Sequence, residues 1–418
     1  MTAFTGWFAI APLLPYIAKD LKLTPDQRQT SNIPNISSTV IFRILAGILC
    51  DFIGPRRVMA TILIAGAIPT ALTGLCSDVN GFYAVRFFIG ILGATFVPCQ
   101  FYTTQMYDKN VVGSANAFAG GWGNLGGGLT YILMPLVFDG LNSSIQNPNI
   151  TWRVALVIPA GLCIIVAILN LIFADDYPGG DWLKRKDSSI GVNGHTVNGH
   201  VEDKVAEVHE ANEKKVDNYP VDEDTKTKKN NKLKELWKAF INPNVIIMMM
   251  QYACTFGVEL AVDGVIGEFF ISHFQINVSS GNFIGAIFGL MNIFSRATGG
   301  MLSDFGNRGF GTGTKEDKFY NGMRGRLLCQ FLALFLEGVL LLAFRFSLNT
   351  LASAIVVMIF FSYFTQAGCG TTYGIAPYID PEIYGTVAGL IGTGGTLGGI
   401  AFASVFKLYA ESLQNGFM

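Results

Sequence analysis

Eleven long apolar stretches constrain the fold of this 418-residue chain more than any other feature. Each is long enough to cross a bilayer as a helix, because about 20 apolar residues span the hydrocarbon core. Lipid offers no hydrogen bonds to the backbone, so we expect an all-α polytopic membrane protein. The spans are predicted at residues 2–18, 33–53, 58–76, 82–106, 112–138, 153–173, 243–271, 279–302, 326–346, 351–377 and 383–409.

A long polar segment separates the first six spans from the last five. Residues 175–241 are rich in lysine and acidic residues and mostly lack apolar periodicity, which predicts a largely disordered linker. Near its end, Leu233, Leu236, Trp237 and Phe240 recur at helical spacing, which is typical of a short helix on the membrane surface. The predicted organisation is therefore a helix bundle over 1–174, a linker over 175–241 and a second bundle over 242–418.

Basic residues predict the orientation of the chain in the membrane. Arg56, Arg57, Lys109, the linker and the loop from Arg308 to Arg326 all fall on one side, and the other side carries fewer lysines and arginines. The richer side is expected to be cytoplasmic. The linker is therefore expected to be cytoplasmic too.

The composition excludes several classes of function. The formal net charge of −1 gives no reason to expect nucleic acid as a partner. The seven cysteines lie in apolar runs and the four histidines do not cluster with them, so we expect no disulfide framework and no metal site. The sequence holds no phosphate loop and no pairing of a nucleophile with a base, so we expect neither an enzyme nor a cofactor.

The two halves repeat one another. "RILAGILCDFIGPRR" begins at Arg43 and "RATGGMLSDFGNRG" begins at Arg296, and in each the arginine precedes an aspartate, Asp51 or Asp304, by eight residues. Many transporters are built from such repeats. A candidate gating set lies at the cytoplasmic ends of these spans, where aspartate and arginine could latch the bundles together: Asp51, Arg56, Arg57, Asp304 and Arg308. The alternative is that these basic residues only hold their loops inside.

Arg43 and Arg296 lie in the middle of apolar spans, where an arginine costs about 2.5–3.5 kcal/mol on insertion scales. Equivalent positions in two repeats indicate one central site, and a guanidinium fork matches a planar oxyanion. The alternative is that each arginine pairs with a buried acid. Candidate acids are Glu259, Asp263 and Glu337, one of which is expected to titrate if transport is coupled to protons; the sequence leaves open which. Tyr252 is the best aromatic candidate, ahead of Trp7, Phe8 and Trp122.

Two glycine-rich runs stand inside predicted spans. The run "AGGWGNLGGG" holds Asn124, and "GLIGTGGTLGG" holds Thr396. Small residues let helix backbones approach closely, so packing of the fifth span on the eighth and of the eleventh on the second is expected. Asn124 is expected either to reach the anion or to bond to a neighbouring helix. The residues of the two motifs are Gly120, Gly121, Trp122, Gly123, Gly126, Gly127 and Gly128 in the first, and Gly394, Gly395 and Gly398 in the second.

These motifs resemble those of a known family. "GILCDFIGPRR" resembles the loop between the second and third helices of the major facilitator superfamily, and "RFFIGILG" its fourth-helix motif. "AGGWGNLGGG" resembles the signature of the nitrate/nitrite porters within it. The resemblance implies a major facilitator fold of two pseudo-symmetric bundles. That fold normally has twelve helices, and since only eleven are visible we expect helix twelve to be missing.

The resemblance also implies a function. It predicts a monomeric transporter that imports nitrate, and nitrite as well, together with protons by alternating access at the plasma membrane. Its substrate-binding residues are expected to be Arg43, Arg296, Asn124, Thr396 and Tyr252. The family usually has an asparagine where this chain has Thr396, whose hydroxyl is also both a donor and an acceptor. A nitrate/nitrite antiporter and a non-transporting membrane sensor on the same fold remain as alternatives.

Overall fold

Helices make up the regular secondary structure in a computed structural model of the chain, as the apolar spans predict. The structure describes residues 1–107, 111–178, 180–183, 237–310, 318–381, 383–409 and 416–417. Most of the predicted linker, with Leu233 and Leu236, lies outside the described residues, as does Lys109. Trp237 and Phe240 are described, and both are exposed on a short helical stretch just before Pro243.

The first half of the chain forms six membrane-crossing segments. The first is broken into α1, the 3-10 turn η1 and α2, and the fourth into α6, η3 and α7, while the short helix α3 precedes α4. The bounds are α1 Thr2–Phe8, η1 Ala11–Leu13, α2 Leu14–Asp20, α3 Pro25–Thr30, α4 Asn32–Ile53, α5 Pro55–Leu72, η2 Thr73–Leu75, α6 Val79–Ile89, η3 Gly90–Thr95, α7 Phe96–Met106, α8 Val112–Ile145, α9 Pro148–Ala155 and α10 Val157–Phe173.

The second half supplies five more segments. Its first crossing is followed by a separate helix, α14, and its second is interrupted by the turn η4. The bounds are α13 Pro243–Asp263, α14 Ile266–Phe274, α15 Val278–Leu290, η4 Met291–Ile293, α16 Ser295–Phe310, α17 Lys318–Phe346, α18 Leu351–Ile375, η5 Ala376–Tyr378 and α19 Tyr384–Leu408.

Eight helical segments among the described residues are long and apolar enough to cross a membrane. The other three predicted spans are present but fall short of that standard. Two are broken, α1–η1–α2 and α15–η4–α16, and the glycines and Asn124 of α8 dilute its hydropathy. The spans therefore lie where the sequence places them, and the protein is a multi-pass membrane protein.

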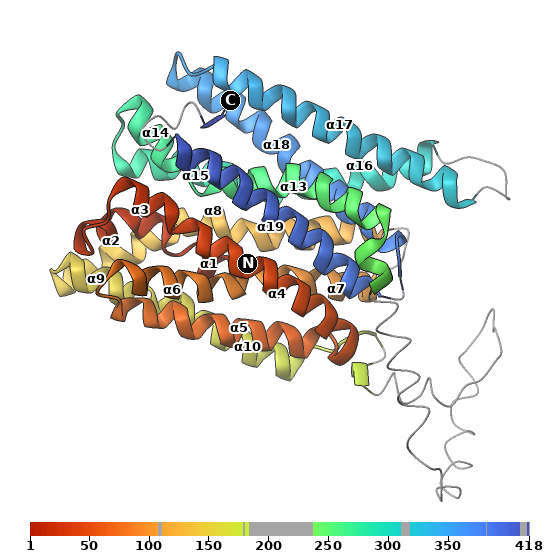
Figure 1. Ribbon diagram of the computed structural model, residues 1–418, viewed down its shortest axis with the longest axis horizontal. Helices are drawn as coiled ribbons and strands as arrows, with labels where there is room; N and C mark the ends of the chain where they lie inside the picture. Colours follow the sequence, from red (N-terminus) through yellow and green to blue (C-terminus); the bar gives the residue numbers. More distant parts are fainter. Residues whose placement is uncertain are drawn as a thin grey trace, which may run out of the picture.

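The two halves form two bundles that pack side by side with their helices roughly aligned (Figure 1). Helices α5 and α10 lie on the outside of one bundle and α17 on the outside of the other. Between them, α4 packs on α19, and α8 packs on α15 and α16. The predicted pairing of the fifth span with the eighth and of the eleventh with the second is therefore confirmed.

Glycines make these crossings close. A Cβ atom placed at Gly128 of α8 would lie 2.6 Å from the carbonyl carbon of Gly289 in α15, well inside van der Waals contact. At the other crossing, a Cβ atom at Gly47 of α4 would lie 3.2 Å from the Cα atom of Gly389 in α19. The backbones of the two halves therefore touch directly along both crossings.

Candidate functional site

Arg43 lies in the middle of α4 and is completely buried. Its Nε donates to the carbonyl of Gly93 at 3.1 Å, and one terminal nitrogen donates to the carbonyl of Gly392 in α19 at 2.6 Å. The first acceptor belongs to the 3-10 segment η3, and the second to the opposite half. The other terminal nitrogen has no acceptor among the described residues. Arg43 therefore bridges the halves and keeps one donor group uncommitted.

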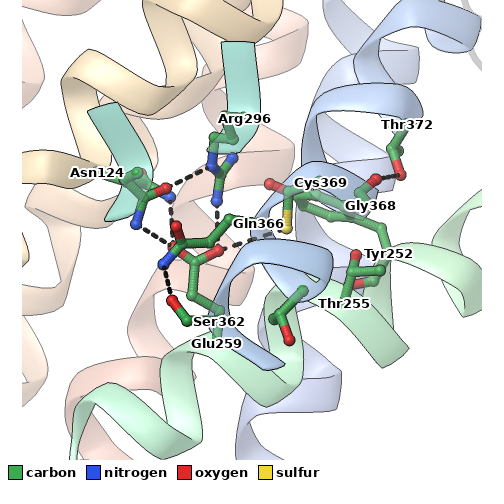
Figure 2. A network of polar contacts seen from close by, with 12 residues as sticks. Asn124, Tyr252, Thr255, Glu259, Arg296, Ser362, Gln366, Gly368, Cys369 and Thr372 are labelled. Atoms are coloured by element: carbon green, nitrogen blue, oxygen red, sulfur yellow. Dashed lines mark hydrogen bonds and ion pairs between the residues drawn. The ribbon is translucent and has the colours of Figure 1, made fainter. Parts of the chain in front are cut away.

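Arg296 enters from the opposite half, on α16, and is 1% exposed. Its Nε donates to the Asn292 side chain at 2.9 Å, and a terminal nitrogen forms a 2.5 Å ion pair with Glu259 of α13. Figure 2 shows Asn124, Arg296 and Cys369 converging on this carboxylate. Asn292 also donates to Glu259, at 2.8 Å. Glu259 is thus a buried planar oxyanion held by four donors.

Both guanidinium groups pack on the same two aromatic rings. The Arg43 guanidinium carbon lies 4.7 Å from the centre of the Phe256 ring and 5.4 Å from that of Phe96. For Arg296 the corresponding distances are 5.6 and 5.8 Å. These are cation–π distances, and they place the two cations around one aromatic pair at the interface of the halves. Tyr252 and Tyr373 complete an aromatic box, with ring centres 5.1 Å from Phe256 and 5.0 Å from Phe96 respectively.

The structure brings three of the five predicted binding residues, Arg43, Arg296 and Tyr252, into this box. Asn124 lies one step away, where its amide nitrogen donates to Glu259 at 3.3 Å. Thr396 is buried, but its hydroxyl donates to the carbonyls of Gly392 and Thr393 in its own helix. Gly392 is also the carbonyl that receives Arg43, so Thr396 is linked to the site only through that shared acceptor.

The two glycine motifs divide their contacts. Gly120, Gly121, Gly126, Gly127 and Gly128 are buried, Gly123 is partly exposed, and Gly121 and Gly128 lie against Asn292 and Gly289 of the opposite half. Gly394, Gly395 and Gly398 instead pack on Met249, Tyr252 and Ala253 of α13. Trp122 is 51% exposed, stacks on Phe118 and lines a cavity that also reaches Phe96, so its role at the anion site stays a prediction.

The other two candidate acids are buried without an ion pair among the described residues. Glu337 of α17 is 4% exposed and lies beside Thr365. Asp263 ends α13 at the crossing of α8 and α15, next to Gly127 and Gly289, and its backbone carbonyl accepts from the Tyr131 hydroxyl. Of the three acids, only Glu259 has the arginine partner that the alternative interpretation offered.

Two aspartates join the halves at the end of the bundle nearest the linker. Asp51 accepts from the backbone N–H groups of Gly385 and Thr386, at 3.1 and 2.8 Å, in the first turn of α19. Asp304 accepts from the N–H of Ser114 at 2.7 Å in the first turn of α8. Each carboxylate therefore caps a helix of the opposite half, where unpaired N–H groups and the helix dipole favour an anion.

The arginines of the predicted gating set behave differently from the aspartates. Arg56 and Arg57 bond to Asp181, and Arg56 also to Asp176 and Ala174, all within the first half. Arg56 and Arg57 therefore do not form an aspartate–arginine latch between the bundles. They anchor the chain that follows α10. The Arg308 side chain lies outside the described residues. Arg326, which was not predicted, forms a 2.7 Å ion pair with Asp304.

Sequence reasoning missed Phe96, Phe256, Tyr373, Asn292 and Cys369. The aromatic residues look like ordinary membrane packing, because phenylalanine is abundant throughout the spans. Only Asn292 carried a usable signal: it lies four residues before Arg296, on the same helical face, and is an amide in an apolar run.

Comparisons with known proteins identify the family of the chain. The sequence profile described as the Major Facilitator Superfamily matches residues 1–403. Nitrate transporter 2.2 of Chlamydomonas reinhardtii is 35% identical over 95% of this chain and 68% of its own length. High affinity nitrate transporter 2.5 of Arabidopsis thaliana is 34% identical over 96% of this chain and 71% of its own.

Solved structures share the fold at much lower identity. A proton:xylose symporter of the superfamily, bound to a bromodeoxyglucose, superposes with a TM-score of 0.65 at 13% identity, over 100% of this chain and 89% of that one. An inward-facing bacterial homologue of the lysosomal transporter Spinster gives a TM-score of 0.61 at 15% identity, over 98% and 80%. The chain belongs to the major facilitator superfamily and, within it, to the family of nitrate transporters.

Proposed function

We propose that this protein is a secondary active transporter that imports nitrate by alternating access. The observation that carries the proposal is the convergence of Arg43 and Arg296, one from each half, on the aromatic pair Phe96 and Phe256. A binding site shared by both halves is what alternating access requires, because the site then faces either side as the halves rock. The names of the relatives supply the substrate.

The chemistry of the site suits a planar monovalent anion. Nitrate is a weak base, so it must be held by direct charge-assisted hydrogen bonds rather than by protonation. Arg43 offers its uncommitted terminal nitrogen, and Arg296 a fork that already holds a carboxylate. We propose that the anion lies between the two guanidinium groups, with Tyr252 beside it and Asn124 at the edge of the network. Nitrite, which is also planar and smaller, fits the same donors.

Proton coupling is part of the proposal, and Glu337 is its strongest candidate. An unpaired carboxylate is costly inside a membrane, so a buried acid without a cation is a natural proton carrier. Glu259 is bound by Arg296 and Asp263 lies at a helix crossing, whereas Glu337 lies beside Thr365 and forms no ion pair with a described residue. We further propose that the monomer is the transport unit, that it works at the plasma membrane, and that the linker is cytoplasmic.

Reconstitution into liposomes tests these statements together. With an inward proton gradient, nitrate should accumulate inside the vesicles, and the gradient should be consumed as it does so. If nitrate accumulates only when nitrite is present on the opposite side of the membrane, the protein is a nitrate/nitrite antiporter and not a symporter. If folded protein gives no nitrate flux, the alternative of a non-transporting sensor is favoured. Arg43→Lys and Arg296→Lys should each impair uptake, because a point charge cannot reproduce the bidentate fork.

Arg345→Lys provides the matched control. Arg345 lies in the last turn of α17, away from the aromatic box, and should tolerate the same exchange. Wild-type affinity for nitrate in both Arg43→Lys and Arg296→Lys would overturn the proposed site.

A further inference from the structure

We propose a second anion-binding site, centred on Arg86, between the central box and the end of the bundle opposite the linker. Its ligand is a small monovalent oxyanion. Arg86 lies in α6, is 2% exposed, and forms no ion pair with any described residue. It donates instead to the backbone carbonyl of Ser31 and to the side chain of Asn32. A buried guanidinium without a carboxylate is a positive charge that a ligand can neutralise.

Arg86 lines a cavity at the interface of the two halves. The cavity has a volume of about 30 Å³, and its walls come from α1, α3, α4 and α6 on one side and from α13, Gly264, Val265 and α19 on the other. A single buried water needs roughly 10–15 Å³ of such cavity volume, so the cavity suits about two waters or one small oxyanion. No acidic residue is among the described residues that line it.

Other donors face the same space. Asn32 and Asn35 bring side-chain amides, and Trp7 brings an indole N–H that has no acceptor among the described residues. Trp7 is also completely buried. A guanidinium, amides and an indole N–H are the donor types that bind an oxyanion by hydrogen bonds, and the apolar remainder of the wall strengthens each of them.

The position of the cavity indicates a staging site, by which we mean a site that the anion occupies before it reaches the central arginines. A wider cavity of about 290 Å³ shares Ala11, Asn32 and Gly264 with it and reaches Arg28 and Glu268. Gln29 donates to Glu268 at 2.8 Å, which ties α3 to α14 between the two halves at the end of the bundle (Figure 1). An anion arriving there would meet Arg86 before it reaches Arg43 and Arg296. This inference rests on the proposed function, since it takes the transported anion as the ligand.

Tryptophan fluorescence of the purified full-length protein gives a direct test. Nitrate quenches indole fluorescence, but collisional quenching cannot reach the buried Trp7, so binding in the cavity should add a saturable component. This component is expected in wild type, absent in Trp7→Phe, and preserved in Arg296→Lys. Arg86→Gln should weaken its apparent affinity about tenfold or more, because hydrogen bonds from a charged donor are lost.

Further variants separate charge from folding. Arg86→Lys keeps the charge and should lose less affinity than Arg86→Gln, while Asn35→Leu removes an amide without changing any charge and should also weaken binding. Lys19→Gln, an exposed residue at the same end of the bundle, should have no effect. Unchanged quenching in both Arg86→Gln and Asn35→Leu, in protein that imports nitrate normally, would overturn the staging site and leave the proposed function standing. Absence of import by wild type would instead count against the proposed function.

Discussion

At the scale of single residues, the Glu259–Arg296 pair explains how a membrane interior tolerates a permanent cation. Arginine stays charged at any physiological pH, so it needs a counter-charge or an anion beside it. Glu259 supplies the charge, and Asn292, Asn124 and Cys369 satisfy the rest of its acceptor capacity. Arg296 holds the carboxylate with the same donors that a planar substrate would need. These donors therefore suit a planar, negatively charged acceptor.

Removing this internal carboxylate should make the protein depend on its substrate. Glu259→Gln keeps the size of the side chain but puts an amide NH2 where one carboxylate oxygen accepts, and it leaves Arg296 without a counter-charge. Breaking a buried pair in this way costs about 3–5 kcal/mol. We expect a lower apparent melting temperature in nitrate-free buffer and a larger rise on adding nitrate than in wild type. Asp139→Asn, which changes an exposed acid of α8, should change neither. Equal stabilisation of both variants by nitrate would contradict this reading of Glu259.

The aromatic rings that contact both arginines should matter for nitrate binding as much as the arginines themselves. Phe256→Leu keeps an apolar side chain but removes the cation–π contact to both arginines, each worth about 0.5–2 kcal/mol depending on desolvation. The KM for nitrate uptake is therefore expected to rise about tenfold. Phe270→Leu serves as the control, because Phe270 is equally buried but stacks on Phe274 of α14 and meets neither arginine. A similar KM in the two variants would rule out the role of the ring.

At the scale of helices, the sequence predicts the positions of the membrane spans better than the interruptions within them. Every span was found where hydropathy placed it, because length and apolarity alone decide whether a helix can cross a membrane. The interruptions η3 and η4 were not predicted, since neither contains a proline. They matter for the site: η3 presents the Gly93 carbonyl to Arg43, and η4 carries Asn292. Their cause is tertiary packing, which a periodicity argument does not include.

The glycines of α8 give a clear helix-scale prediction. Gly128→Ala would place a methyl group 2.6 Å from the backbone of Gly289 and Leu290, so α8 and α15 would have to separate. We expect nitrate uptake to be almost abolished in protein that still reaches the membrane. Gly140 lies in the same helix with nothing within 4 Å of its missing Cβ atom. Gly140→Ala should therefore preserve uptake and gain up to about 1 kcal/mol of helix propensity; equal loss in both would point to a general defect of α8.

At the scale of the whole molecule, the repeated motif places equivalent residues of the two halves at their shared interface, where each contacts the opposite half. The equal spacing of Arg43 and Asp51, and of Arg296 and Asp304, predicted one shared site and one shared set of end contacts. The structure adds what spacing cannot contain, namely which partner each residue meets across the interface. Arg43 and Arg296 differ in this respect: one binds backbone carbonyls and the other a carboxylate. This difference arises from residues of α13, α18 and α19, which lie outside both repeated motifs in the sequence.

The aspartate caps should control which side of the protein opens. Asp51 and Asp304 each hold the first turn of a helix in the opposite half, and a carboxylate at a helix N-terminus contributes about 0.3–1 kcal/mol, and up to about 2 when partly buried. The double variant Asp51→Asn, Asp304→Asn loses both charges while keeping the side-chain size. A combined loss of about 2–3 kcal/mol would raise the ratio of molecules open at the linker end to closed molecules more than tenfold.

Native cysteines report this opening. Cys369 lies beside Glu259 and is 1% exposed, so a membrane-impermeant thiol reagent applied from the linker end reaches it only after the bundles separate there. In the double variant we expect Cys369 to be labelled from that side at least several times faster than in wild type. Cys163, buried on α10 inside one bundle, should label slowly in both. Asp20→Asn is the matched variant, because the Asp20 carboxylate accepts from Trp152 and Arg153 within the first half. If Asp20→Asn accelerates labelling of Cys369 as much as the double variant does, the two caps do not hold the linker end closed, and the closure must come from the glycine crossings instead.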